Sequence, residues 1–267
     1  MKKLSINTDD FGLSADINRG IKEAYAGGRL TDASLMANGP AFEDAVDIAK
    51  DTGMPLCAHI NLIRGKMLSG MDTYRGIRAL WLDSLTGEGR KRIEREAGLQ
   101  IERILKENLI INQLNSEKHT HFFPVLFELF IKLAESYKIP YIRFINEFGI
   151  SFSLQGIKAW ILGSFAGMNR GWMKRSSVGR ADWFRGIGVS GKLDRDNIKE
   201  VLSGIKPGHT EFMVHIGYEG EIDGIMGRYF LNRQREGELD ALLSVEDGFF
   251  FENDIELVSF GGGYGNK

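Results

Sequence analysis

Short apolar runs and stretches of helical periodicity alternate along this chain, and this alternation limits its fold more than any other feature of the sequence. The apolar runs are rich in aliphatic and aromatic side chains and have the length of buried β-strands. They lie at residues 4–7, 33–37, 56–62, 110–115, 140–145, 184–189, 211–216 and 255–260. Most are followed by segments in which apolar residues recur every three or four positions, as do Ile93, Ala97, Ile101 and Leu105.

The order of these elements predicts the fold class. Seven or eight strand and helix units follow one another without a linker, which is typical of an α/β protein with a largely parallel sheet. We therefore expect one domain over residues 1–267, built as a distorted TIM-like (β/α) barrel. An open, doubly wound sheet is the alternative, since periodicity does not distinguish a closed sheet from an open one. Residues 67–89 should form a surface loop, and residues 151–189 an inserted loop or helical region that includes a short strand.

Composition and charge exclude several classes of function. The net charge is −2 and no dense basic stripe is present, which argues against a nucleic-acid partner. Cys57 is the only cysteine, so the chain has neither an internal disulfide nor a thiolate metal cluster. The N-terminal MKKLSINTDD lacks the apolar core of a signal peptide, and no window approaches the roughly 18 apolar residues of a membrane helix. We expect a cytoplasmic protein without a membrane span.

Two adjacent carboxylates, Asp9 and Asp10, stand at the end of the first predicted strand. Leu4 and Ile6 alternate with polar residues before them, and a Phe-Gly turn and a helix that Ser14 can cap come after them. The pair is therefore expected at the carboxyl end of a strand, where α/β proteins bind their ligands. The alternative is a pair of solvated loop aspartates, which are common in turns.

Other polar side chains that suit catalysis or metal binding follow further predicted strands. They are His59 and Asn61 after the third, Glu117, His119 and His121 after the fourth, and His215 at the end of the seventh. In an extended chain residues 117, 119 and 121 point to one face, which places a carboxylate beside two imidazoles, ligands suited to Zn, Mn, Fe or Mg. The alternative is a set of histidines with structural hydrogen bonds. His209 lies in a Pro-Gly-His turn and is expected to be solvated.

The order of these motifs, NTDDFGLS, LTDASLMANGPA, AHINL, LNSEKHTHFFP and EFMVHIGY, resembles the YdjC family of carbohydrate deacetylases, which includes chitooligosaccharide and hopanoid-biosynthesis deacetylases. The resemblance implies a TIM-like barrel, often dimeric, that uses one divalent metal ion to hydrolyse an N-acetyl or similar amide on a sugar. Matching positions imply that Asp10 and His59 bind the metal, that Asp9 is the catalytic base, and that His215 is a general acid or contacts the substrate. A homodimer is expected on the same ground.

The third metal ligand departs from the family pattern. Family members usually have Asp-Ser-His-x-His-x-His where this chain has Asn-Ser-Glu-Lys-His-Thr-His at residues 115–121, so Glu117 replaces a histidine. Glu117 can bind the metal directly, which would move the preference towards Mg or Mn. Alternatively, His119 or His121 takes its place, or the site has lost metal and activity. We favour direct ligation by Glu117, with Mg or Zn, or else Mn, as the ion.

The remaining expectations concern the reaction. The metal would activate a water molecule, Asp9 would take its proton, and His215, or His121, would protonate the leaving sugar amine. The residues expected to contact the sugar are Asn61, His119 and Arg143. Two alternative functions are another metal-dependent hydrolase, such as a phosphoesterase or a non-sugar amidase, and a carbohydrate-binding relative without catalytic activity.

Overall fold

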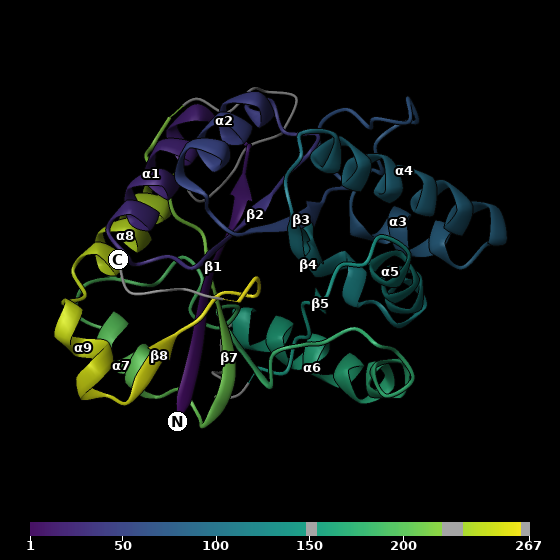
Figure 1. The fold of residues 1–267 in the computed structure, drawn as a ribbon. Helices are drawn as coiled ribbons and strands as arrows, with labels where there is room; N and C mark the ends of the chain where they lie inside the picture. Colours follow the sequence, from purple (N-terminus) through teal and green to yellow (C-terminus); the bar gives the residue numbers. More distant parts are fainter. Residues whose placement is uncertain (148–153, 221–231, 263–267) are drawn as a thin grey trace.

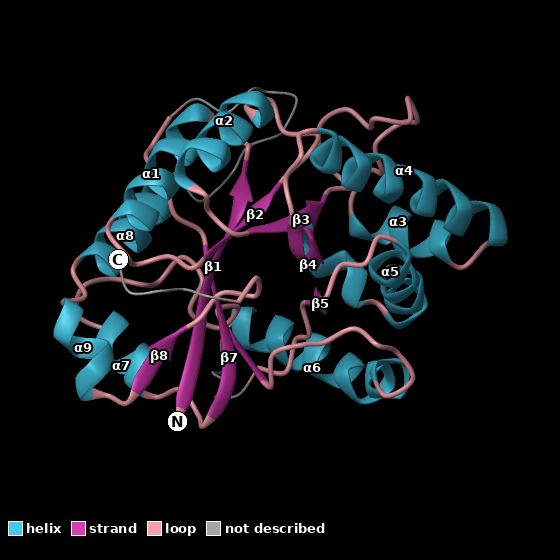
Figure 2. Cartoon of the chain, in the orientation of Figure 1, coloured by secondary structure: helices cyan, strands magenta, loops and turns pink. Residues whose placement is uncertain are grey.

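A computed structural model describes residues 1–147, 154–220 and 232–262, and in it parallel strands occupy the centre of the molecule with helices around them (Figures 1 and 2). The strands are β1 (Lys2–Phe11), β2 (Asp32–Leu35), β3 (Leu56–Ile60), β4 (Ile111–Ser116), β5 (Tyr141–Ile142), β6 (Trp183–Arg185), β7 (Gly208–Val214) and β8 (Ile255–Leu257). The helices are α1 (Ala15–Ala26), α2 (Phe42–Thr52), α3 (Ile77–Ser84), α4 (Gly87–Lys106), η1 (Glu117–Phe122, a 3-10 helix), α5 (Pro124–Ser136), α6 (Leu154–Met173), α7 (Ile198–Ser203), α8 (Asn232–Leu243) and α9 (Asp247–Glu252).

The sheet curves towards a barrel. Its strands follow the order β5, β4, β3, β2, β1, β7, β6, and β8 pairs with the first residues of β1. Two isolated parallel bridges, from Tyr141 to Gly179 and from Glu147 to Phe184, join the β5 and β6 edges of this order. The expected α/β class and the distorted TIM-like barrel are therefore confirmed, and among the described residues β5 and β6 are joined by these single bridges.

The interior of the barrel is polar, whereas the apolar core lies between strands and helices. On β1, Leu4 and Ile6 are fully buried in the apolar core. Asn7, between them and the strand end, instead donates hydrogen bonds to Gln113 of β4 at 3.3 Å and to Glu211 of β7 at 3.2 Å. These bonds cross the inside of the barrel, so one face of β1 carries polar side chains up to the carboxylates at its end.

Several helix boundaries follow directly from the sequence. The Ser14 side chain accepts a hydrogen bond from the Ile17 amide and caps α1 as expected. Helix α2 ends at Thr52 and is capped by Gly53, which adopts the left-handed conformation with a φ of 67°. Helix α5 begins at Pro124, whose missing N–H is tolerated in the first turn. These signals fix the helices that follow β1, β2 and β4.

Other stretches differ from expectation. The predicted loop 67–89 contains α3 and the start of α4, because Leu80 and Ser84 are the only buried residues of α3 and give too sparse a pattern to recognise. The stretch 151–189 contains α6 and β6, and β6 pairs with β7 in the barrel; residues 148–153 lie outside the described residues. The solvated role expected for His209 is wrong, because its half-buried ring bonds to Ser5 at 2.7 Å. In the described ranges, no helix is both long and apolar enough to cross a membrane.

Candidate active site

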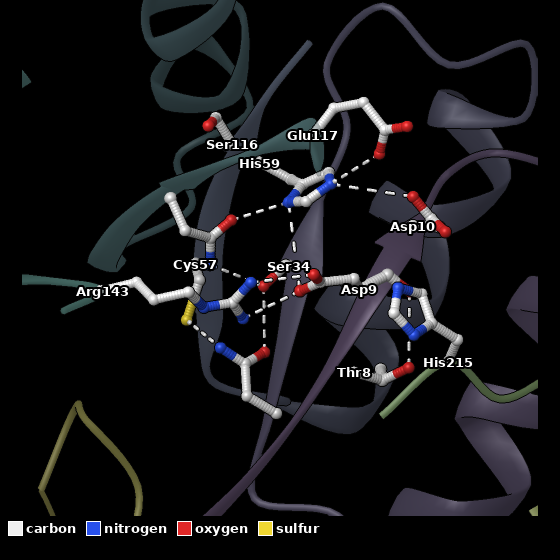
Figure 3. A network of polar contacts seen from close by, with 12 residues as sticks. Thr8, Asp9, Asp10, Ser34, Cys57, His59, Ser116, Glu117, Arg143 and His215 are labelled. Carbon is white, nitrogen blue, oxygen red and sulfur yellow. Dashed lines mark hydrogen bonds and ion pairs between the residues drawn. The ribbon is translucent and has the colours of Figure 1, made fainter. Parts of the chain in front are cut away.

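The polar side chains at the carboxyl ends of β1, β3, β4 and β7 converge on one region of the barrel (Figure 3). Asp9 and Asp10 come from the end of β1, His59 from β3, and Glu117 from the first residue after β4. His215 follows the last residue of β7. Because parallel strands end at the same side of a barrel, residues more than 200 positions apart in the chain meet here.

An irregular backbone at the end of β1 directs both aspartates to the same place. Successive residues of a strand normally point to opposite faces, so Asp9 and Asp10 should diverge. Asp10 instead has a φ of 68°, and the register between β1 and β2 shifts between Thr8 and Phe11. A non-glycine residue in this region costs on the order of 1 kcal/mol, although Asp tolerates it better than most. The result is that both carboxylates lie beside His59.

Asp10, His59 and Glu117 form a compact buried group. His59 Nε2 lies 3.6 Å from Asp10 Oδ1 and 3.5 Å from Glu117 Oε2. One ligand atom from each residue lies within 4.8 Å of the other two, and all three side chains are buried. An imidazole nitrogen and two carboxylate oxygens are suitable ligands for Zn, Mn or Mg. Among the residues that the structure describes, these three could hold a divalent ion.

A hydrogen bond to Asn115 fixes the orientation of the His59 ring. Its Nδ1 lies 2.7 Å from Asn115 Oδ1, while the Asn115 amide nitrogen donates to Ser34 at 2.8 Å. The Asn115 oxygen therefore accepts a hydrogen bond from His59 Nδ1–H, which leaves Nε2 directed at Asp10 and Glu117. A ligating histidine is commonly held in this way by a hydrogen bond at its other nitrogen.

The charges around His59 favour its protonated form when no ion is bound. Burial lowers the pKa of His59, but the Asp9, Glu117 and Asp10 carboxylates outweigh burial and raise the pKa to about 9. Burial raises the pKa of Glu117, but His59 and Arg64 outweigh it and lower the pKa to about 2. A divalent cation would take the place of this proton among the same carboxylates.

Asp9 is bound to a buried arginine. Arg143 Nη1 and Nη2 each donate to one oxygen of Asp9 at 2.8 Å, and Arg143 Nε donates to Glu211 at 2.8 Å. Burial raises the pKa of Asp9, but Arg143 and His59 outweigh it and hold the pKa well below its usual range. Asp9 is therefore ionised, and its orientation is set by the bidentate pair.

His215 stands at the edge of this group. Its side chain is half-buried, and its Nδ1 lies 3.3 Å from Ser190 Oγ. Its backbone amide donates to Glu238 of α8 at 2.7 Å, and Glu238 also accepts from the Gly191 amide. This contact ties the end of β7 to the loop that carries Ser190. Of the expected catalytic side chains, His215 is the one that solvent reaches most easily.

The segment after β4 does not have the expected extended geometry. Lys118 and His119 have φ values of 51° and 57° within η1, so residues 117, 119 and 121 do not share one face. His121 is fully buried, and its two ring nitrogens lie 2.7 Å from Ser116 Oγ and 3.1 Å from the Arg143 carbonyl. Burial lowers the pKa of His121 to about 3. This environment does not suit the expected proton transfer, and His121 is not part of the group formed by Asp10, His59 and Glu117.

Three residues expected to contact the sugar are buried. Asn61 closes the turn after β3, where its Oδ1 accepts from the Arg64 amide at 3.1 Å and its Nδ2 donates to the Arg64 carbonyl at 3.0 Å. Arg143 is fully buried between Asp9 and Glu211. His119 is also buried, with its ring edge-to-face against Phe184. Asn61 and Arg143 therefore position other residues of the site.

Three further charged residues belong to the site. Arg64 Nε donates to Glu117 Oε1 at 2.8 Å, and Arg235 Nη2 donates to Asp10 Oδ2. Glu211 binds Arg143, as described above. Glu211 could have been found, because an acidic residue within the apolar run EFMVHI is unusual in a buried strand. The arginines follow no such pattern, since their partners lie 53 and 225 residues away.

Comparison with known proteins matches most of this chain to one protein family. The family model described as YdjC-like protein matches residues 3–248. A carbohydrate deacetylase of Geobacillus stearothermophilus is 37% identical over 139 residues, which cover 51% of this chain and 57% of that protein. A carbohydrate deacetylase of Brevibacillus brevis is 34% identical over 143 residues, covering 52% of this chain and 58% of that protein. The matched segment thus spans little more than half the length of these relatives.

Two solved structures share the fold. A protein of Enterococcus faecalis V583, provisionally named a cellobiose-phosphate cleavage protein, has a TM-score of 0.71 at 20% identity, covering 97% of this chain and 98% of its own. An uncharacterized protein of Agrobacterium tumefaciens C58 has a TM-score of 0.53 at 14% identity, covering 96% and 87%. At these identities the similarity establishes the barrel architecture alone.

Proposed function

Because this chain belongs to the YdjC-like protein family, we propose that it is a divalent-metal-dependent hydrolase that removes an N-acetyl or similar acyl group from an amino sugar. The observation that carries the proposal is the buried group of Asp10, His59 and Glu117 beside the ionised Asp9. The names of the relatives, carbohydrate deacetylases, support a sugar substrate.

In this proposal Asp10, His59 and Glu117 hold one ion. When bound, the ion supplies Lewis-acid polarisation of the acyl carbonyl and of the attacking water. The ligand set, with two carboxylates and one imidazole, is compatible with Zn and also suits the harder ions Mg and Mn. Direct ligation by Glu117 is supported by its Oε2, which faces His59 at 3.5 Å.

Asp9 and His215 take the proton-transfer roles. The carboxylate of Asp9 is held in place by Arg143, and its Oδ1 lies 3.9 Å from His59 Nδ1, at the edge of the ligand group. Its low pKa keeps Asp9 ionised, and the carboxylate would take the proton of the attacking water, whose acidity a bound ion would increase. His215 is half-exposed and held at Nδ1 by Ser190, and it donates a proton to the leaving amine.

Acetate release from a panel of N-acetylated sugars by the metal-reconstituted protein tests the proposal. Asp10→Asn and Glu117→Gln should lower the rate by about 100-fold or more, since even the loss of an outer metal contact typically costs 10- to 100-fold. Asp9→Asn should lower kcat by about 100-fold or more with little change in metal affinity. Asp247→Asn, at an exposed carboxylate, is the matched control and should retain full activity.

The other outcomes identify the alternatives. Phosphate release from generic esters without acetate release would indicate a phosphoesterase. Acetate release from non-sugar amides alone would indicate a different amidase. Sugar binding that survives chelation, without turnover under any added ion, would indicate a carbohydrate-binding protein. Full activity of Glu117→Gln with unchanged metal affinity would reject the assignment of Glu117 as a ligand.

A further inference from the structure

Each carboxylate of the ligand group has one oxygen directed at His59 and the other bound to an arginine. For Asp10, Oδ1 lies 3.6 Å from His59 Nε2, while Oδ2 accepts a hydrogen bond from Arg235 Nη2. For Glu117, Oε2 lies 3.5 Å from the same nitrogen, while Oε1 accepts from Arg64 Nε at 2.8 Å. The two carboxylates are thus arranged alike, although their arginines come from opposite ends of the chain.

Arg64 lies in a turn that several hydrogen bonds stabilise. The Asn61 side chain spans the turn by accepting from the Arg64 amide and donating to the Arg64 carbonyl. Gln100 of α4 binds the backbone of Asn61 on both sides, accepting from its amide at 2.9 Å and donating to its carbonyl at 2.7 Å. Helix α4 therefore sets the position from which Arg64 reaches Glu117.

The position of Arg235 is set by helix α8. It is fully buried on α8, one turn before Glu238. Glu238 accepts hydrogen bonds from the backbone amides of His215 and Gly191, which anchor α8 to the end of β7. The two arginines thus approach the ligand group from different elements, and each donates a hydrogen bond to the carboxylate oxygen that does not face His59.

We infer that Arg64 and Arg235 are positioning residues that limit Glu117 and Asp10 to one metal-facing oxygen each, and so set which ions the site accepts. The inference rests on the proposed metal-dependent function. Calcium takes six to eight oxygen ligands and readily uses both oxygens of a carboxylate, whereas magnesium and zinc need fewer ligands at shorter distances. A carboxylate whose second oxygen is bound to a guanidinium therefore disfavours calcium.

The arginines also balance charge. Glu117 places a second negative charge beside Asp10 and His59, and the guanidinium of Arg64 offsets this charge at a distance of 2.8 Å. Arg235 does the same for Asp10. Because affinity for hard cations rises with the number of charged oxygens, two balanced carboxylates bind calcium less tightly than two unbalanced ones.

Titration calorimetry of the metal-free full chain with Ca, Mg, Mn and Zn tests the inference. Arg64→Gln removes the charge from a side chain that is 17% exposed. It should tighten calcium binding relative to zinc binding by about tenfold, a typical effect of a residue that contacts a metal ligand. Arg64→Lys keeps the charge and should leave the ratio within about threefold of wild type. Arg92→Gln, at an ion pair on α4 with Asp83, is the matched control and should leave it unchanged.

The outcomes are distinct. Equal weakening for all four ions, or an unchanged calcium-to-zinc ratio, would overturn the inference. If Arg64→Gln does not fold, Asn61→Ala provides a second test, because it loosens the turn and keeps the arginine. Asn61→Ala should shift the calcium-to-zinc affinity ratio in the same direction by a smaller factor, and no shift would overturn the inference. A wild type that binds no divalent ion would overturn both proposals. A shifted ratio without acetate release from any sugar supports the inference and rejects the proposed function.

Discussion

Replacement of Arg143 by methionine should destabilise the protein by an amount that depends on pH. Arg143 is fully buried and makes three hydrogen bonds of 2.8 Å, two to Asp9 and one to Glu211. Methionine preserves much of the apolar stem but removes these bonds and the charge. Glu211 retains bonds from Gln113 at 2.8 Å and Asn7 at 3.2 Å. Asp9 is therefore the carboxylate that loses its main partner.

The magnitude follows from the two states available to Asp9. Removal of one partner from a buried ion pair typically costs about 3 to 5 kcal/mol. Protonation limits this cost, since adding a proton at pH 7 to a carboxyl group with an ordinary pKa near 3.9 costs about 4 kcal/mol, and at pH 5 about 1.5 kcal/mol. We expect the free energy of unfolding to fall by about 4 kcal/mol at pH 7 and by 2 to 3 kcal/mol less at pH 5.

The direction in which this loss of stability changes with pH follows from the pKa of Asp9. In the wild type this pKa is held well below its usual range, so the stabilisation is present above the unfolded-state pKa near 3.9 and is lost only in stronger acid. In Arg143→Met the folded pKa rises above the unfolded value, so the penalty grows as pH increases above about 4. The variant should therefore differ most from wild type at neutral pH.

Urea unfolding followed by circular dichroism at pH 5 and pH 7 measures the effect. Asp9→Asn combined with Arg143→Met removes both charges and should lose most of the pH dependence. Arg92→Gln, which disrupts an exposed ion pair, should change stability by less than about 1 kcal/mol at either pH. A loss below about 1 kcal/mol for Arg143→Met at pH 7, or the same loss at both pH values, would show that Arg143 does not stabilise an ionised Asp9.

Three further predictions concern neighbouring groups. Because His59 has a pKa raised to about 9 and must be neutral to bind a metal, the apparent Kd for Mn, measured by calorimetry, should rise about tenfold for each unit that the pH is lowered below 9; a Kd independent of pH would contradict this. His121→Phe removes two buried hydrogen bonds and should cost about 1 to 3 kcal/mol of stability in urea unfolding, with Mn affinity unchanged; lost affinity in a folded variant would identify His121 as a ligand. Burial raises the pKa of Asp32 to about 8, so the free energy of unfolding of the wild type should fall as the pH rises from about 4 to 8. Thermal unfolding of Asp32→Asn should show a smaller fall over this range. An equally steep fall in the variant would show that Asp32 does not cause the pH dependence.

The sequence predicted the site best where strand order alone determines geometry. The apolar runs placed Asp9, Asp10, His59 and Glu117 at the ends of parallel strands, and such ends meet at one side of a barrel. No knowledge of side-chain contacts was needed for this step. The convergence of Asp9, His59 and Glu117 on one side of the barrel follows from the alternation of strands and helices, whereas Asp10 joins them because of its positive φ.

The backbone of the site was less predictable. Period-two spacing after β4 suggested one shared face for residues 117–121, but Lys118 and His119 adopt positive φ values. The Ser116 hydroxyl accepts from the His121 amide at 2.8 Å and holds this turn in place. A single side-chain bond to the backbone thus overrides the local pattern, and a sequence does not reveal which serine will make one.

The arginine partners could not be predicted at all. Arg64 and Arg235 meet their carboxylates through ion pairs that span 53 and 225 residues, and neither follows a periodic pattern. The same is true of Arg143, which was expected to face a substrate but lies between two buried carboxylates. Long-range pairing of charges depends on the finished fold, whereas local periodicity reports only which side of an element is buried.

We propose that Asp10, His59 and Glu117 together bind a divalent ion. A crystal structure of the protein grown with Zn or Mn, with anomalous diffraction measured at the metal edge, would locate this ion. We expect one strong anomalous peak about 2.0 to 2.2 Å from His59 Nε2, Asp10 Oδ1 and Glu117 Oε2. A peak beside His119 or His121 and away from Glu117, or no peak at this group at saturating ion, would show that these three residues do not form the metal site.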